Sequence, residues 1–189
     1  MAPLNSEEAE REAVVATAKL MAASARTAPK TRGLDSVKTL ILDGDDELER
    51  LAKAMEERYR DDPDRLSFFK RNAEDVRKSM AVVLIGVTGE PKRVESPLNC
   101  GACGKNCLAT LKAKKVDSGD ARGPMCLFQG IDLGIALGSA VKAASDYNVD
   151  NRIMYSVGVA ARRLKLLDAD LIIGIALSVT GKNVYFTGR

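Results

Sequence analysis

The sequence of 189 residues contains no histidine. Catalysis by Ser–His or Cys–His pairs, zinc sites with imidazole ligands and Rieske-type iron–sulfur centres all need this residue, so these classes are excluded. General acid or base chemistry would fall to carboxylates, lysine, tyrosine or water.

The chain also lacks long apolar runs and an excess of one charge. No apolar run approaches the roughly 20 residues that a membrane-spanning helix needs, and the opening MAPLNSEEAE has neither the basic leader nor the apolar core of a signal peptide. The net charge of +3 arises from 29 basic and 26 acidic residues that alternate along the chain. No strong field therefore points to nucleic acid or a membrane surface, and we expect a cytoplasmic protein with neither partner.

Cysteine is scarce, but its four copies are grouped. They lie within 27 residues of each other, at Cys100, Cys103, Cys107 and Cys126. In a reducing cytosol such a group indicates metal ligands or redox groups sooner than structural disulfides. Two residues separate the first two cysteines, three separate the next two, and the fourth follows after 18 more. Three close ligands plus one remote ligand is a common arrangement for [4Fe–4S] clusters.

Zinc is the main alternative metal, because many zinc sites also consist of four thiolates. A zinc ribbon usually brings two C-x2-C pairs, whereas here 18 residues separate Cys107 from Cys126, so the spacing favours an iron–sulfur cluster. Gly101 and Gly104 would let the backbone wrap tightly. Amides directed at the sulfurs, with Lys105 nearby, would stabilise added negative charge. Plain thiols or disulfides are a third interpretation.

The length of 189 residues and the hydrophobic content of 46% predict a single domain over residues 1–189. Helices are predicted over residues 6–25, 45–60, 66–78, 127–147 and 150–167, and strands over 37–43, 81–87, 171–178 and 184–188. The segment 89–126 is rich in Gly, Pro, Lys and Cys and has little periodicity. We interpret it as an inserted cluster-binding loop that a metal would order. The predicted fold class is α+β, with helices packed around a small sheet.

The predicted helix 127–147 is apolar nearly all round, so we expect it to be deeply buried. Three glycines recur in it at every fourth residue: Gly130, Gly134 and Gly138. Each costs about 1 kcal/mol of helix propensity relative to alanine, which indicates that another backbone, such as that of a second subunit, packs closely there. Asp132 in the same helix needs a cap or a partner, for which Arg152 is a candidate, and this structural role outweighs a catalytic one.

Four stretches carry a family resemblance: LNCGACGKNC, GPMC, DLGIALGSAVKAASDYNVDNRIMYSVGVAA and IALSVTGKNVYF. They resemble a prokaryotic family of uncharacterised proteins that contain a ferredoxin domain, and the likeness covers nearly the whole length. The resemblance implies a redox protein that carries an iron–sulfur cluster on the four cysteines, which would be ligands without a direct role in covalent chemistry.

A second resemblance lies in AASARTAPKTRGLDSVKTLILDGDDELERLA, which is similar in order and spacing to the start of flavin-dependent nitroreductases. It implies an α+β helix/sheet sandwich, an intertwined homodimer and FMN at the subunit interface. Arg26, Lys30 and Arg32 near the Ala-Pro turn would then be contacts to the flavin and its phosphate, with Lys182 a further candidate. The Arg-x-Ser phosphate signature of nitroreductases is missing, so flavin binding is left open.

Two functional interpretations follow. The first is an iron–sulfur redox protein, in the form of a flavin-dependent oxidoreductase that passes electrons between a [4Fe–4S] cluster and FMN or an electron-transfer partner. The second is a non-enzymatic structural, interaction or sensor module, in which a cluster or zinc orders segment 89–126. The basic run KAKK at 112–115 is a solvated face or a dock for an acidic partner. Neither a substrate nor a catalytic residue can be named, so only an oxidoreductase class is assigned if the protein is an enzyme.

Overall fold

The computed structural model describes residues 3–186, which form a mixture of helices and strands. In chain order the elements are α1 (Ser6–Thr27), the short 3-10 helix η1 (Thr31–Gly33), β1 (Val37–Leu42), α2 (Asp45–Asp61), α3 (Ser67–Arg77), β2 (Ala81–Val87), α4 (Cys107–Lys112), β3 (Val116–Asp117), β4 (Arg122–Gly123), α5 (Leu127–Asp146), β5 (Asp150–Met154), α6 (Tyr155–Arg163) and β6 (Leu171–Ser178). The predicted α+β class is confirmed.

Four of the strands form one antiparallel sheet in the order β1-β2-β6-β5. Strand β2 lies in the interior of the sheet, with Leu84 opposite Leu40 of β1 on one side and opposite Gly174 of β6 on the other. All seven residues of β2 are buried. The continuous apolar run that predicted this strand is thus explained by burial on both faces.

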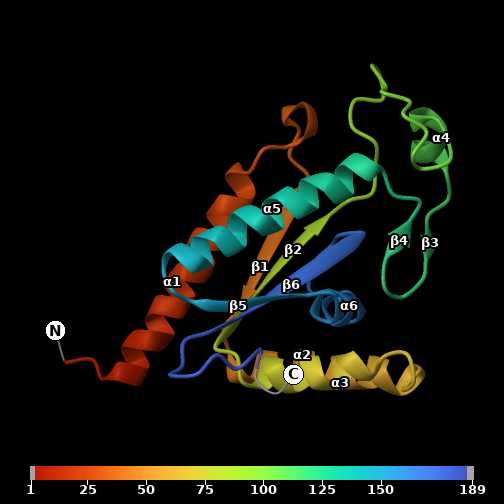
Figure 1. Cartoon of the computed structure of the whole chain (residues 1–189). Helices are drawn as coiled ribbons and strands as arrows, with labels where there is room; N and C mark the ends of the chain where they lie inside the picture. The colour runs from red at the N-terminus through yellow and green to blue at the C-terminus, as the bar shows by residue number, and fades with distance from the viewer. Residues whose placement is uncertain (1–2, 187–189) are drawn as a thin grey trace.

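Two helical layers cover the sheet, with α1 and α5 on one face and α2, α3 and α6 on the other (Figure 1). Alternate residues of β2 serve the two layers. Val82 and Leu84 belong to the cluster with α2, α3 and α6, whereas Val83 and Ile85 belong to the cluster with α1 and α5. Because side chains alternate along a strand, one run supplies both cores.

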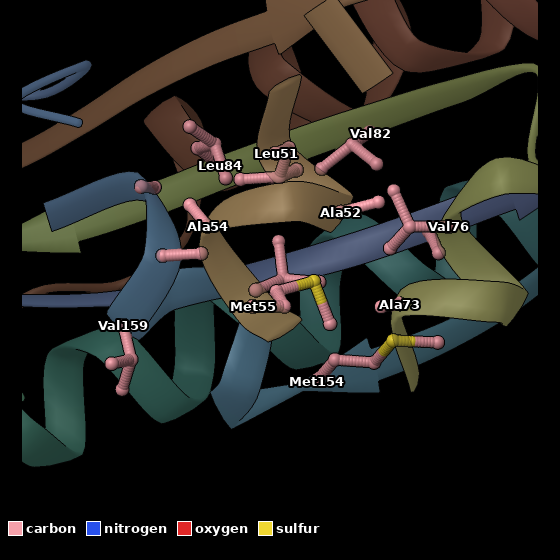
Figure 2. Packing of buried hydrophobic residues seen from close by; sticks show 14 of the residues in the cluster. Leu51, Ala52, Ala54, Met55, Ala73, Val76, Val82, Leu84, Met154 and Val159 are labelled. Atoms are coloured by element: carbon pink, nitrogen blue, oxygen red, sulfur yellow. The ribbon is translucent and has the colours of Figure 1, made fainter. Parts of the chain in front are cut away.

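The core between the sheet and helices α2 and α3 stabilises the sheet. Figure 2 shows Leu51 and Met55 of α2 gathered with Val76 of α3, Leu84 of β2 and Met154. All five side chains are almost fully shielded from solvent. Burying each large apolar side chain contributes roughly 1.5–3 kcal/mol, so this layer holds β2 and β6 firmly in place.

Two predicted elements are wrong. Asp150–Met154 is not the start of a helix but the edge strand β5, which pairs along β6, and the helix begins only at Tyr155. The edge of β6 offers backbone hydrogen-bonding groups to residues 150–154, and the local sequence pattern of these residues does not reveal that pairing. The predicted strand at 184–188 is also absent as far as residue 186, and the rest of it lies outside the described residues. Tyr185 is buried instead, with its hydroxyl 3.0 Å from the Ser79 hydroxyl.

Helix α5 is buried on one face only, which corrects the expectation of an all-round buried helix. Its inner residues Leu133, Ala136 and Ala140 lie in the core shared with α1. Its outer face exposes Ile131 and Ile135, and no other group lies within 4 Å of a side chain built at any of its three glycines. Within residues 3–186, α5 is the one helix that is long and apolar enough to cross a membrane. Buried core helices of soluble proteins commonly meet the same two criteria.

The segment between β2 and α5 projects from one end of the sandwich (Figure 1). It carries the six-residue helix α4 and the two-stranded β3–β4 hairpin, both of which the sequence left unpredicted. It leaves the sheet after Val87 and returns at Cys126, the residue that precedes α5. All four cysteines lie in this segment.

Candidate metal centre

All four cysteines line one pocket, which lies beyond the carboxyl end of β2. Thr31 and Arg32 of η1 form part of its wall, and Lys92 comes from the beginning of the cysteine segment. Leu127 and Phe128 contribute from the first turn of α5. Two separate stretches of the chain that supply cysteines therefore meet at one place.

The four thiols differ in their access to solvent. Cys107 and Cys126 are buried, Cys103 is half-buried and Cys100 is exposed, and all four are unpaired thiols. A cluster bound here would have a buried side toward α5 and an open side toward Cys100.

Tight backbone turns position the first three cysteines. Gly101 and Gly104 have φ values of 77° and 75°, a left-handed conformation that favours glycine. The N–H of Gly104 donates to the carbonyl of Gly101 at 2.8 Å, which closes the turn that carries Cys103. The N–H of Cys107 donates to the side-chain oxygen of Asn99 at 3.0 Å. The role expected for the two glycines is thus seen in the backbone.

Helix α4 places a hydroxyl beside Cys103. The Thr110 hydroxyl oxygen lies 2.9 Å from the Cys103 sulfur and 3.0 Å from the carbonyl oxygen of Asn106, so its one proton can be donated to either acceptor. The hydrogen bond with Thr110 lowers the pKa of the Cys103 thiol, outweighs the opposing effect of burial and is aided by the Lys105 charge. Because metals bind the thiolate, this environment favours the form of Cys103 that acts as a ligand.

Cys126 sits immediately before the 20-residue helix α5, as its N-cap residue. Its N–H donates to the carbonyl of Gly89 at 2.8 Å, which joins the two ends of the cysteine segment. The start of a long helix carries partial positive charge. Cys126 therefore lies at the positive end of α5.

A residue that sequence reasoning missed holds this arrangement in place. Asp170 is fully buried and accepts a hydrogen bond of 2.7 Å from the N–H of Gly89. Its carboxylate also forms ion pairs with Lys115 and with Arg122, the latter at 2.7 Å. The one signal in the sequence is an acidic residue directly before the apolar strand 171–178.

The charges around Asp170 outweigh the effect of its burial. Burial alone would raise the pKa of this carboxyl, but Lys115, the N–H of Gly89 and Arg122 bring it below the ordinary value. Asp170 is therefore ionised at neutral pH and ties the cysteine segment to the start of β6.

A second buried ion pair forms the pocket wall and corrects the expected partner of Asp132. Asp132 pairs with Lys92, and both side chains are nearly excluded from solvent. The N–H and hydroxyl of Thr31 donate to the other carboxylate oxygen at 2.9 and 2.8 Å. Arg152 instead pairs with Asp75 at 2.7 Å, because β5 directs it toward the opposite helical layer. The Asp132 network ties η1 and the cysteine segment to α5.

Two of the proposed flavin contacts are engaged within the chain. Arg26 pairs with Asp35 near the end of α1. Lys30 is largely buried, and its ammonium group donates to the carbonyls of Ala25 and Ala28 at 2.8 Å each. Lys30 thus neutralises the carbonyl end of α1, a role that positive charge commonly has at a helix C-terminus.

The other two candidates lie at opposite ends of the sheet. Arg32 lines the cysteine pocket and donates to the carbonyl of Ser96 at 2.6 Å. Lys182 is exposed in the loop after β6, whose last residue, Ser178, lies at the end of the sheet remote from the pocket. Within one chain, the structure brings only Arg32 to the pocket, and the flavin contacts remain a prediction.

The donor set fits a cluster held by four thiolates. Among residues 3–186, no three cysteine or acidic side chains converge as a ready-made site for a single metal ion. The four cysteines instead line one shared pocket, and four thiolates are the usual ligands of a [4Fe–4S] cluster. Zinc accepts the same ligand type.

The antiparallel sheet between two helical layers defines a nitroreductase-fold protein. The chain is similar to nitroreductase A of Vibrio parahaemolyticus, with a TM-score of 0.53, 13% identity and coverage of 100% of this chain but 64% of that one. It is also similar to a putative nitroreductase from Desulfovibrio desulfuricans, solved in complex with FMN, with a TM-score of 0.54, 12% identity and coverage of 100% and 81%. At such identities the likeness shows the fold, and the predicted nitroreductase-like sandwich is confirmed.

Sequence comparison identifies the family more closely. A model described as "Uncharacterized protein containing a ferredoxin domain" matches residues 122–187, which include Cys126. A protein of Archaeoglobus fulgidus is 44% identical over 184 residues, 97% of this chain and 96% of its own length. The chain belongs to this ferredoxin-domain family. Family and fold together indicate a redox role.

Proposed function

We propose that this protein is an iron–sulfur redox protein. In this proposal Cys100, Cys103, Cys107 and Cys126 hold a cluster of the [4Fe–4S] type. The observation that carries the proposal is that two distant stretches of the chain bring all four thiols to one pocket. The ferredoxin-domain family supports the same assignment.

The residues around the pocket suit thiolate ligands. A bound cluster would supply one-electron transfer. Thr110 stabilises negative charge on Cys103 by hydrogen bonding, and Cys126 lies at the positive end of α5. Hydrogen bonds to ligand sulfurs and nearby positive charge stabilise the reduced state, which raises the reduction potential.

FMN as a second cofactor would make the protein an oxidoreductase. The observation that favours it is Arg32, a cation on the wall of the cysteine pocket in a nitroreductase fold. A similar solved structure is described as an NADPH:FMN oxidoreductase and another as a complex with FMN. Arg32 would contact the flavin or its phosphate, with Arg26, Lys30 and Lys182 as further candidates.

A homodimer would cover the outer face of α5. We infer this because Ile131 and Ile135 are exposed there beside three glycines with open space above them. Small residues let two helix backbones approach closely, and apolar burial would drive the association. We also propose a cytoplasmic location, since four unpaired thiols suit a reducing compartment.

Anaerobic purification tests these proposals together. We expect a brown protein with about four iron and four sulfide per chain, the content of a [4Fe–4S] cluster, and acid release of FMN if the second cofactor is present. A colourless protein with one zinc per chain would contradict the redox proposal and favour a non-enzymatic metal module. A brown protein without releasable flavin would refute only the FMN proposal.

A further inference from the structure

Helix α4 turns its polar residues inward and its leucines outward, the reverse of an ordinary surface helix. Cys107 and Thr110 are buried toward the pocket. Leu108 is 49% exposed and Leu111 is 40% exposed. Residues three and four apart share a helix face, so Leu108, Leu111 and Lys112 lie side by side. An outward apolar face next to a functional pocket is typical of a contact surface.

Lysines precede and follow these leucines in the sequence. Residues 96–116 contain four lysines and no acidic residue. Lys115 is bound to Asp170 and Glu90, whereas the other three form no ion pair within the described part of the chain and are exposed. We call the following residues the α4 patch: Lys105, Leu108, Leu111, Lys112 and Lys114. The patch therefore combines apolar area with three positive charges.

The α4 patch lies close to the cysteines. Thr110, on the inner face of α4, is within hydrogen-bond distance of the Cys103 sulfur. Lys105 lines the same pocket as the four cysteines. Because an α-helix is only about 10–12 Å across, a partner seated on the outer face of α4 would come close to the cysteines.

We propose that the α4 patch docks a small acidic electron-carrier protein. This rests on the proposed iron–sulfur function and adds the class of partner. The carrier would give one electron to the oxidised cluster that the four cysteines would hold, so the carrier would be oxidised and the cluster reduced by one electron. No bond is made or broken. The lysines steer the acidic partner to the patch and orient it, and the two leucines provide the apolar centre of the contact.

Other occupants suit the patch less well. A symmetric contact between two copies would bring the same lysines against each other, and like charges in an interface are repulsive. Nucleic acid would engage the lysines through phosphate but would leave the leucines unused, because phosphate contacts are charged and polar.

Binding of model carriers to the cluster-containing protein tests the proposal. The probes are a purified acidic [2Fe–2S] ferredoxin and, for contrast, a basic c-type cytochrome of similar size, each titrated by calorimetry. We expect binding of the ferredoxin alone, with affinity falling at least about tenfold between about 0.02 and 0.5 M salt, because screening weakens contacts between exposed charges. Absence of binding, or binding independent of salt, overturns the proposal.

A matched pair of variants locates the contact. Lys112→Glu with Lys114→Glu reverses two charges of the α4 patch, and Lys19→Glu with Lys70→Glu makes the same change on α1 and α3, where both lysines are also exposed. We expect about tenfold or greater weakening for the patch variant and less than about twofold for the control. Equal weakening in both variants overturns the proposal.

Iron content separates this proposal from the function on which it rests. The patch variant should keep the iron and sulfide content of the unmodified protein, since neither substituted lysine is a proposed ligand. Full iron content with unchanged ferredoxin binding refutes the docking surface alone, whereas an iron-free unmodified protein refutes the function and the docking with it. The unmodified protein could instead fail to bind ferredoxin but self-associate or bind a DNA oligonucleotide. If only the patch variant loses that interaction, the patch belongs to another partner.

Discussion

The buried carboxylate of Asp170 accepts a hydrogen bond of 2.7 Å from the N–H of Gly89, whose carbonyl accepts one of 2.8 Å from the N–H of Cys126. Gly89 thus links the start of β6 to the fourth proposed ligand. Lys115 and Arg122 of the same segment pair with the same carboxylate. A single buried acid therefore holds the entry, the middle and the exit of the cysteine segment.

Replacing this acid should loosen the whole segment. Asp170→Asn keeps the size of the side chain but leaves Lys115 and Arg122 without their counter-charge in a buried place. We expect the free energy of unfolding to fall by about 3 kcal/mol, the lower end of the range for breaking a buried pair, because Lys115 retains some contact with water. Iron content should fall as well. Urea unfolding and iron assay measure the two effects.

The neighbouring acid provides the control. Asp168 is 87% exposed and pairs with Lys38 at 3.2 Å. Asp168→Asn should change the free energy of unfolding by less than about 1 kcal/mol, as is usual for an exposed pair, and should leave the iron content unchanged. Equal effects of the two variants would show that Asp170 has no special role.

The contribution of Asp170 to the free energy of unfolding should change with pH only under acidic conditions. Its pKa in the folded protein lies below the ordinary value of 3.8, so its contribution is fully present above that value and is lost as pH falls through the folded pKa. The difference in unfolding free energy between the unmodified protein and Asp170→Asn should be constant from neutral pH to about pH 5 and shrink below about pH 4. Urea unfolding of the metal-free chains measures it, and a difference that grows in acid contradicts the assignment.

The fourth ligand is tested by Cys126→Ser. A serine hydroxyl is a poor substitute for a thiolate ligand, so we expect partial or complete loss of iron and sulfide. Met125→Leu is the control, because this swap nearly conserves volume, costs less than about 1.5 kcal/mol and should leave the iron content unchanged. Unchanged iron in Cys126→Ser would place the fourth ligand elsewhere.

The proposed dimer is tested on the outer face of α5. Ile135→Asp places a charge among exposed apolar residues, which should change the stability of a monomer by only about 0.5 kcal/mol but disrupt a dimer packed through this face. Light scattering after gel filtration should give twice the chain mass of 20.3 kDa for the unmodified protein and about the chain mass for the variant. Ser145→Asp on the same helix is the control and should remain dimeric. A monomeric unmodified protein would refute the dimer.

Hydrophobic periodicity predicted most helices and strands correctly, because each of these elements buries the apolar residues of its own pattern. The strand predicted at 81–87 is Ala81–Val87, and the helix predicted at 6–25 is Ser6–Thr27. Strand β5 escaped prediction because its partner is the free edge of β6, which follows about 20 residues later in the chain. Local patterns carry no information about an edge that forms only on folding.

The candidate site likewise has one part that the sequence predicts and another that it does not. The cysteine spacing and the two turn glycines identified Cys100, Cys103 and Cys107 as a local group, because neighbours in sequence must be neighbours in space. Only the tertiary structure decided what surrounds this group. It paired Asp132 with Lys92 in place of Arg152, brought Arg32 but not Lys182 to the pocket, and set Asp170 beneath the segment.

The sequence by itself determined the α+β class, the central strands and a group of four cysteines suited to a metal, since each depends on spacing within a short stretch. The tertiary structure decided that Cys126 joins the other three in one pocket and that α4 faces outward with its leucines. The physical reason is that both features depend on how the carboxyl end of β2 and the amino ends of β6 and α5 are placed relative to one another. Buried ion pairs between residues far apart in the sequence fix these positions.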